Sequence, residues 1–296
     1  MSKHLSKNNK IKVIAIVGAT ASGKTAYSIE LAKKFDAEII SADSRLVYQG
    51  FNIGTAKPTI QEQDGIPHYM IDIVAPEFEY SAGLYKEQAK KIILEIHSKG
   101  KTPIIVGGTG LYIDILLKNY NLPKIEANKD LREELSKLTW DELYNNLKKL
   151  DPEAAESINT NDRKKIIRAI EIIKATNMPL SKTRGIDESE YDIQWIGRNF
   201  DRETLYSRID KRVDIMIEYG LLEETKNLLD KHGRIPNLVH TIGYKEILGY
   251  IDNKYSLTEA AELLKKNTRN YAKRQLTWFR KNDEIEWNIY PDKLKK

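Results

Sequence analysis

The chain has 296 residues, of which 41% are hydrophobic and 31% are charged, a composition typical of a globular protein and not of a disordered or membrane-spanning one. It contains no cysteine, which excludes disulfide bonds, thiolate zinc sites and a cysteine nucleophile. The net charge of +5 is mild and only hints at a polyanionic partner.

The N-terminal segment is polar and basic and leads into a short apolar run, Val13–Val17. This run is far shorter than the roughly 20 apolar residues that a membrane-spanning helix needs. It continues into a Gly-rich loop without a small-residue cleavage site, so we expect a frayed tail and a buried strand, not a signal peptide. We therefore expect no membrane association, and the absence of cysteine fits a cytoplasmic location.

The first third of the chain alternates between strand and helix patterns. Short apolar runs predict strands at Val13–Val17, Glu38–Ser41, Met70–Val74 and Pro103–Val106. Helical spacing predicts one helix over Lys24–Phe35 and another that Ser81 can cap. The apolar residues Leu84, Ile92, Ile93 and Ile96 fall largely on one face of this second helix. Strands that alternate with helices indicate a parallel sheet covered on both faces.

The pattern changes after Tyr120. Residues 121–190 are charged, helical in spacing and nearly free of strand signals, which predicts a helical insertion. Residues Tyr191–Asn199 predict one more strand, and the chain from Asp201 to about Lys281 is helical again. We expect three parts: an α/β core over 1–120, the insertion over 121–190, and a return to the core with lid-like and basic helices over 191–296.

A phosphate-binding motif lies between the first predicted strand and helix. GATASGKT matches the Walker A pattern G-x-x-x-x-G-K-[ST] in the required strand–loop–helix context. Backbone N–H groups and the helix N-terminus can hold phosphate, Lys24 adds a positive charge, and the Thr25 hydroxyl can bind Mg²⁺. The expected phosphate ligands are Gly18, Ala19, Thr20, Ala21, Ser22, Gly23, Lys24 and Thr25. The motif predicts a P-loop NTPase-like sheet, but a kinase would share it.

Two loops follow predicted strands and should face this phosphate site, because ligands of open parallel sheets bind beyond the carboxyl ends of the strands. ADSRLVYQG carries Asp43, which is either a helix cap or a general base or magnesium ligand. VGGTGLY carries Thr109, whose hydroxyl could reach a diphosphate; the alternative is that the glycines form only a tight turn.

Basic residues cluster in the later part of the chain. Lys164, Lys165 and Arg168 lie within about one helical turn, and no acidic residue occurs between Leu263 and Lys281. The latter segment places Lys273, Arg274, Arg280 and Lys281 near Trp278 and Phe279. Basic residues interleaved with aromatic ones are typical of RNA binding; the alternative is a solvated helix face over core aromatics. We expect Trp278 and Phe279 themselves to be core residues.

Arg208 and Arg212 lie four residues apart on one predicted helical face. This spacing resembles the arginine-bearing lid of P-loop kinases, which closes over phosphates. Surface pairing with Glu203 and Asp214 is the alternative. His68 and His240 do not have metal-ligand spacing, so we assign no metal to them.

Seven blocks in order resemble the tRNA dimethylallyltransferase family of bacterial type. They are GATASGKT, ADSRLVYQGFNIGTAKP, YSAGLY, VGGTGLY, NDRKKIIRAIE, HTIGYKE and YAKRQLTWFRK, and they span roughly Val13 to Lys281. The resemblance implies transfer of a dimethylallyl group from dimethylallyl diphosphate to the exocyclic N6 of the adenine 3′ of the anticodon, in tRNAs that read codons beginning with U. It also implies Mg²⁺ as cofactor, the tRNA anticodon stem-loop as partner and a monomer.

The resemblance also implies roles for single residues. Asp43 resembles the base that removes the N6 proton, and Thr109 resembles the group that hydrogen-bonds the bridging oxygen of the leaving diphosphate. Lys24 and Thr25 resemble the diphosphate and magnesium ligands. Arg208 and Arg212 are added to the expected diphosphate ligands because of their kinase-lid spacing. The expected tRNA contacts are Asp43, Ser44, Arg45, Leu46, Thr109, Arg132, Lys164, Lys165, Arg168, His240, Gly243, Tyr244, Lys245, Lys273, Arg274 and Gln275. Two departures from the family pattern are Ala19 and the pair Arg45-Leu46.

Three other functions stay open at this point. A small-molecule or nucleoside kinase would share the core but would leave the basic, aromatic carboxyl half unexplained. A nucleotide-gated RNA-binding protein without catalysis would leave Asp43 and Thr109 unexplained. An enzyme that prenylates free adenine nucleotides would be expected to lack the RNA-binding half.

Overall fold

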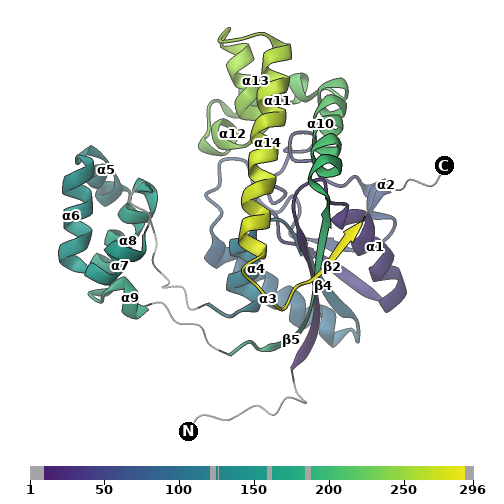
Figure 1. The fold of residues 1–296 in the computed structure, drawn as a ribbon, viewed down its shortest axis with the longest axis horizontal. Coiled ribbons are helices and arrows are strands. Elements are labelled where there is room, and N and C mark those ends of the chain that lie inside the picture. Colours follow the sequence, from purple (N-terminus) through teal and green to yellow (C-terminus); the bar gives the residue numbers. More distant parts are fainter. Residues whose placement is uncertain (1–9, 121–124, 126, 159–161, 184–187, 291–296) are drawn as a thin grey trace. The chain divides into compact units, whose positions relative to one another are not determined.

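The computed structural model describes residues 10–120, 125, 127–158, 162–183 and 188–290 (Figure 1). The predicted tail at residues 1–9 lies outside the described residues. The contacts divide the chain into two compact units, one formed by Met1–Leu117 with Glu190–Lys296 and one by Lys118–Ser189.

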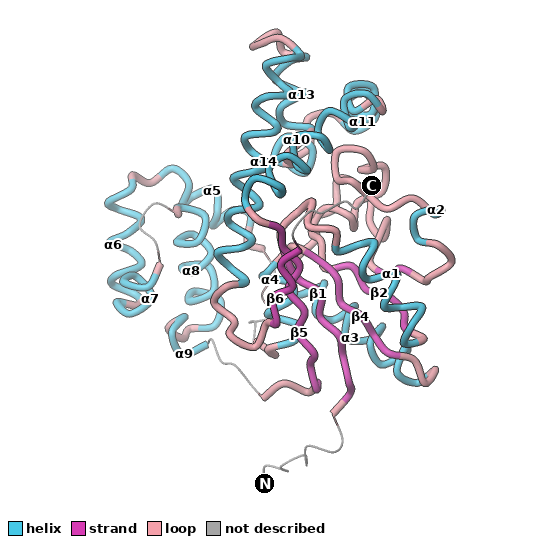
Figure 2. Tube along the Cα trace, turned by 45° about the vertical axis from the view of Figure 1, so that its right-hand side comes forward, coloured by secondary structure: helices cyan, strands magenta, loops and turns pink. Residues whose placement is uncertain are grey.

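Within its described residues, the first unit holds a six-stranded sheet in which every pair of neighbours is parallel. In spatial order the strands are β3 (His68–Tyr69), β2 (Ala37–Ser41), β4 (Thr102–Gly107), β1 (Ile11–Gly18), β5 (Tyr191–Phe200) and β6 (Glu286–Tyr290). Figure 2 shows β2, β4, β1 and β5 side by side. The registers pair Val17 with Gly107 and Gly18 with Arg198, so their carboxyl ends form one edge.

Helices cover both faces of the sheet. Successive side chains of a strand point to opposite faces, and in β1 the side chains on both faces are apolar and need cover. Val13, Ala15 and Val17 of β1 pack on the side of α3 (Ala82–Ser98) and α4 (Gly110–Leu117). Ile14 and Ile16 pack on the side of α1 (Lys24–Phe35). A strand buried on both faces reads as a continuous apolar run, which is why the sequence pattern located it.

The rest of the first unit is helical. It comprises α2 (Ile60–Gln63), α10 (Arg202–Glu218), α11 (Leu221–His232), α12 (Pro236–His240), α13 (Tyr244–Ile251) and α14 (Leu257–Phe279). A second core unites α10, α11, α13 and α14 with the segment from Val47 to Phe51. The long helix α14 begins with a Ser256–Glu259 capping box and runs from α13 to the sheet, where it contacts β1 and α4 (Figure 1).

The second unit is a small helical body with its own core. Its helices are α5 (Lys129–Lys137), α6 (Trp140–Leu150), α7 (Pro152–Ser157), α8 (Arg163–Thr176) and α9 (Leu180–Thr183). Leu143 and Leu147 of α6 are fully buried against Ile166 and Ile170 of α8. Across the described part of the chain, no helix is both long and apolar enough to cross a bilayer.

Most predicted elements are confirmed, and two differ. The strand predicted at Met70–Val74 is wrong, because Met70 and Asp72 have φ of 64° and 55° and turn the chain away from β3. Ile73 and Val74 instead donate backbone hydrogen bonds to the carbonyl of Val47. Strand β6 was not predicted; it is a five-residue strand at the end of the sheet order.

Candidate active site at the carboxyl edge of the sheet

The Walker A loop joins β1 to α1 at the edge formed by the strand ends. Gly18 and Gly23 have φ of 149° and 78°, values that favour glycine. A methyl group at Gly18 would also overlap the Arg198 carbonyl of the neighbouring strand. The Lys24 ammonium donates to the Ala19 carbonyl at 2.6 Å, so its side chain folds back over the loop. Thr25, the next residue of α1, is exposed.

Three arginines surround this loop. Arg208 Nε donates to the Ala21 carbonyl at 3.0 Å, and Arg212 donates to the Thr20 hydroxyl at 3.4 Å. The guanidinium groups of Arg198 and Arg208 would lie 3.8 and 4.0 Å from a methyl group placed on Gly23. Arg208 and Arg212 therefore face the Walker loop. Asp214, a partner in the surface-pairing alternative, pairs with Lys265 instead.

The concentration of positive charge perturbs the groups in it. Burial lowers the pKa of Lys24 to about 7, and the Arg212 charge acts in the same direction, while Asp43 opposes them. Burial, with the Arg208 charge, also lowers the pKa of Arg212. Four cations held this close repel one another, and a bound polyanion relieves the repulsion. The arrangement is therefore suited to a diphosphate.

Arg198 was not among the residues predicted from sequence. It lies near the carboxyl end of β5 and is buried, with its guanidinium 4.3 Å from the centroid of the Tyr27 ring. The available signal was its place near the carboxyl end of a predicted strand, the edge at which ligands of parallel sheets bind.

Asp43 and Thr109 lie together at the ends of β2 and β4. The Ser44 N–H donates to Thr109 Oγ1 at 3.0 Å, and the Thr109 N–H donates to the Ala42 carbonyl at 3.1 Å. Asp43 Oδ1 accepts the Arg45 N–H at 2.8 Å and so closes a turn, not a helix. Within the described residues, Asp43 Oδ2 accepts no hydrogen bond. One carboxylate oxygen is thus fixed and the other is available for chemistry.

The two glycines before Thr109 are required because neighbouring segments pack directly against their backbone. A methyl group at Gly107 would overlap the Ala42 backbone, and one at Gly108 would overlap the Gln275 side chain. Gln275 of α14 accepts the Thr20 N–H at 2.8 Å and donates to the Gly108 carbonyl at 3.0 Å. This buried amide ties the Walker loop to the Thr109 loop, so both polar ends of Gln275 are used inside the protein.

Tyr271, one turn before Gln275, is a further residue that sequence reasoning missed. Its hydroxyl is influenced by both Asp43 and the Thr109 side chain, which act on its pKa in opposite directions. Burial, with the Asp43 charge, raises the pKa of Tyr271 to about 12. The phenol therefore stays protonated at neutral pH. Nothing in the block YAKRQLTWFRK separates this tyrosine from an ordinary helix-packing residue, because the contact depends on how α14 docks.

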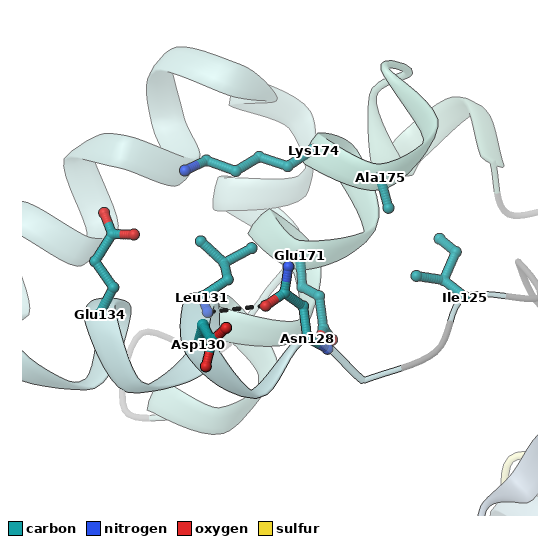
Figure 3. Close-up of a pocket in the computed structure, with 8 residues that line it drawn as sticks. All are labelled: Ile125, Asn128, Asp130, Leu131, Glu134, Glu171, Lys174 and Ala175. Carbon is teal, nitrogen blue, oxygen red and sulfur yellow. Dashed lines mark hydrogen bonds between the residues drawn. The ribbon is translucent and has the colours of Figure 1, made fainter.

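The basic residues predicted in the second unit have two different environments. Arg132 donates two hydrogen bonds of 2.9 Å to the buried carboxylate of Glu171, and Arg168 pairs with the same carboxylate. Burial opposes ionisation of Glu171, but these hydrogen bonds hold its pKa below the usual value. Lys164 and Lys165 are exposed on α8. Figure 3 shows the pocket beside Glu171. None of the predicted phosphate-binding residues lines this pocket.

The HTIGYKE block is also split between surface and core. His240 and Lys245 are exposed, whereas the Tyr244 side chain is fully buried. The Tyr244 hydroxyl donates to Glu224 at 2.7 Å, and its ring lies 4.8 Å from that of Phe51. In this structure Tyr244 therefore supports the segment that follows Asp43 and has no surface to offer to RNA.

The aromatic pair near the end of α14 is divided in the same way. Phe279 is 2% exposed and belongs to the core, as predicted. Trp278 is 42% exposed, so the prediction that it is a core residue is wrong. The adjacent positions on a helix point about 100° apart, and only one of the two can face the sheet. Lys273 and Arg274, one turn earlier, are exposed as well.

The chain is similar to named proteins over nearly all of its length. The family model "IPP transferase" matches residues 46–282. A tRNA dimethylallyltransferase of Pelotomaculum thermopropionicum is 44% identical over 289 residues, covering 95% of this chain and 92% of that protein. A tRNA dimethylallyltransferase of Bacillus mycoides is 47% identical over 282 residues, covering 93% and 89%.

Solved structures give the same relationship. The full-length tRNA isopentenylpyrophosphate transferase from Bacillus halodurans superposes with a TM-score of 0.72 at 44% identity, covering 95% of this chain and 90% of that one. A eukaryotic dimethylallyltransferase acting on tRNA superposes with a TM-score of 0.85 at 33% identity, covering 95% of this chain and 74% of that one.

Proposed function

This chain belongs to the IPP transferase family, and from this premise we propose that it transfers the dimethylallyl group of dimethylallyl diphosphate to tRNA. The acceptor is the exocyclic N6 of the adenine immediately 3′ of the anticodon. The observation that carries the proposal is the joining of Asp43 and Thr109 beside the Walker loop through the Ser44 and Thr109 N–H groups. We further propose that the enzyme is a cytoplasmic monomer that modifies tRNAs reading codons that begin with U.

The donor side of the reaction uses the positive charge around the Walker loop. The bond between the allylic carbon and the bridging oxygen breaks, and negative charge develops on the diphosphate. Lys24, Arg198, Arg208 and Arg212 gather around the Walker loop, and in this proposal the diphosphate binds among them. Preorganised donors of this kind lower the barrier because they need no rearrangement in the transition state. In this proposal the Thr109 hydroxyl hydrogen-bonds the bridging oxygen.

The residues of the Walker loop suit Mg²⁺, because this ion usually binds one or two protein oxygens and completes its coordination shell with phosphates and water. The exposed Thr25 hydroxyl at the start of α1 is the protein oxygen available for it. When bound, Mg²⁺ neutralises part of the diphosphate charge. Within the described residues, no group of three His, Asp or Glu side chains could hold a metal alone.

The acceptor side requires a base. As N6 bonds to the allylic carbon, its proton must leave, and Asp43 Oδ2 is the oxygen without an internal hydrogen bond in the described structure. An adenine stacked in an RNA loop cannot reach this edge, so the base must flip out of the stack. The Tyr271 phenol, which is influenced by both Asp43 and Thr109, stays protonated during this step.

The test is transfer of label to purified tRNA. We expect label from dimethylallyl diphosphate to reach tRNA in the presence of Mg²⁺, and labelled phosphate from ATP to reach no acceptor. The comparisons do not favour the kinase alternative. Phosphoryl transfer to a small molecule without prenylation of tRNA would restore that alternative.

Donor affinity is expected to decline as pH rises above about 7. The pKa of Lys24 is lowered to about 7, and a bound diphosphate must raise it again. Donor binding therefore takes up a proton between pH 7 and the raised pKa, and affinity falls by up to about tenfold per pH unit across that window. The measurement is the dissociation constant of the donor at several pH values.

The control for this prediction is Lys24→Arg, which keeps the positive charge at all these pH values. Its donor affinity should vary much less with pH. If both proteins showed the same pH dependence, the titrating group would be the donor itself or another residue, and Lys24 would be excluded.

Replacing Lys273 and Arg274 together by alanine is expected to flatten the salt dependence of tRNA binding. In a plot of the logarithm of the binding constant against the logarithm of the salt concentration, each lost phosphate contact changes the slope by about 0.7 for single-stranded RNA. We expect the slope to change by the amount that corresponds to one to two contacts. The KM for tRNA should rise and the KM for the donor should stay nearly constant. The measurement is a salt titration of tRNA binding with steady-state kinetics for both substrates.

Lys265 and Arg269 provide a matched control on the same helix. Lys265 pairs with Asp214 and Glu262, and Arg269 pairs with Asp210. Because these charges are already neutralised, the Lys265→Ala/Arg269→Ala protein should keep a slope closer to that of the wild type. Equal slopes for wild type and the Lys273/Arg274 variant would identify those two residues as a solvated helix face.

A further inference from the structure

Trp278 combines exposure with a fixed position. Its indole Nε1 donates to Asp114 Oδ2 at 2.8 Å, which anchors the polar edge of the ring. The ring also packs so closely on Gly110 that a methyl group there would overlap it. Nevertheless 42% of the residue is exposed. A large aromatic surface held rigidly in solvent is unusual in a core-packing residue and typical of a binding residue.

The charges around Trp278 indicate what it binds. Lys273, Arg274, Arg280 and Lys281 are all exposed, and none of them forms an ion pair with a described residue. Farther up α14, Lys265 and Arg269 are neutralised by acidic partners. Apart from the exposed Lys266, the uncompensated positive charge thus gathers at the end of the helix that carries the exposed indole. A polyanion that also presents flat aromatic groups matches this surface, and single-stranded nucleic acid has both properties.

The position of Trp278 relates it to the acceptor site. Tyr271 and Trp278 are seven residues, or about two helical turns, apart on one face of α14, a rise of about 10 Å. Tyr271 lies beside Asp43 and Thr109, and Trp278 packs on Gly110, the residue that follows Thr109. A base on Trp278 and an adenine at Asp43 are therefore within the span of a few nucleotides.

We propose that Trp278 is a stacking platform for an unpaired tRNA base close in sequence to the acceptor adenine. This inference rests on the proposed function and adds a second base subsite to it. The stacked base would hold the opened loop in place while the acceptor adenine is out of the stack. Because every base has a flat face, this contact strengthens RNA binding without selecting a particular base.

The test compares Trp278→Leu with Trp278→Phe, using an anticodon stem-loop RNA as ligand. Loss of one base–aromatic stack should weaken RNA binding by roughly 5- to 100-fold in the leucine variant. The phenylalanine variant should keep most of the affinity. The slope of binding against salt should not change in either variant, because stacking releases no counterions. The KM for dimethylallyl diphosphate should also stay constant.

A scan with single abasic sites identifies the stacked base. In the wild type, an abasic site at that position should weaken binding, and in Trp278→Leu the same RNA should bind no more weakly than the intact one. This non-additivity is the signature of a direct contact. If leucine had no effect, if leucine and phenylalanine weakened binding equally, or if every abasic site acted independently of residue 278, the platform would be excluded.

A second measurement does not depend on the leucine variant. RNA binding should quench tryptophan emission in the wild type, and most of this quench should be absent in Trp278→Phe. An unchanged quench would exclude stacking on Trp278. These results are separable from failure of the proposed function: a wild type that prenylates tRNA but shows no Trp278 effect contradicts only the platform.

Discussion

Replacing Asp43 with asparagine is expected to lower kcat by about two to four orders of magnitude, the usual contribution of a general base. The substitution keeps the size of the side chain and one carbonyl oxygen. That oxygen can still accept the Arg45 N–H, which Asp43 Oδ1 now accepts at 2.8 Å. The second oxygen, which takes the N6 proton, becomes an amide that cannot accept one. Turnover should therefore fall while the dissociation constant for tRNA changes much less.

Asp230→Asn, at an exposed aspartate of α11, is the matched control and should have nearly wild-type turnover. Single-turnover kinetics with saturating substrates measures the chemical step directly. Near-normal turnover of Asp43→Asn would exclude Asp43 as the base. Weakened tRNA binding with normal chemistry would instead make Asp43 a turn-forming residue, the alternative that its bond to Arg45 supports.

Replacing Thr109 with alanine is expected to lower kcat by up to roughly 10²–10³, the scale of removing one donor to developing negative charge. Two effects contribute. The bridging oxygen of the leaving diphosphate loses its hydroxyl donor, and the Ser44 N–H loses the Thr109 Oγ1 acceptor at 3.0 Å. Loss of the second bond loosens the turn that carries Asp43.

Thr109→Ser keeps the hydroxyl and removes only the methyl group, so it should retain most of the wild-type turnover. Donor affinity should weaken less than turnover falls in Thr109→Ala, because the hydroxyl acts mainly where charge develops. Steady-state and binding measurements on both variants decide this. If only the affinity for the donor changed, Thr109 would be a binding residue and not one that stabilises the transition state.

The sequence was most informative where one local pattern determines the structure. The buried run Val13–Val17 and the Walker motif required no knowledge of distant contacts, and both β1 and the loop before α1 lie where predicted. Ser81 caps α3 through the Leu84 N–H, as its position suggested.

Predictions that depended on burial were less successful. Arg132 and Arg168 look like free basic residues in the sequence, but the fold buries Glu171 between them. Tyr244 was expected to contact tRNA but is buried, whereas Trp278 was expected in the core but is exposed. The docking of α13 and α14 decides which of these aromatic side chains is covered. Arg198 and Tyr271 were missed for the same reason: each reaches the site only through tertiary packing.

The central claim is tested most directly by mass spectrometry of tRNA nucleosides from cells with and without this protein. We predict N6-dimethylallyladenosine, or a derivative that retains the five-carbon group, at the adenine 3′ of the anticodon when the wild type is present. The modification should be absent without the protein and strongly reduced when Asp43→Asn replaces it. Identical nucleosides in all three cell types, with the adenine unmodified throughout, would contradict the proposed prenyl transfer to tRNA.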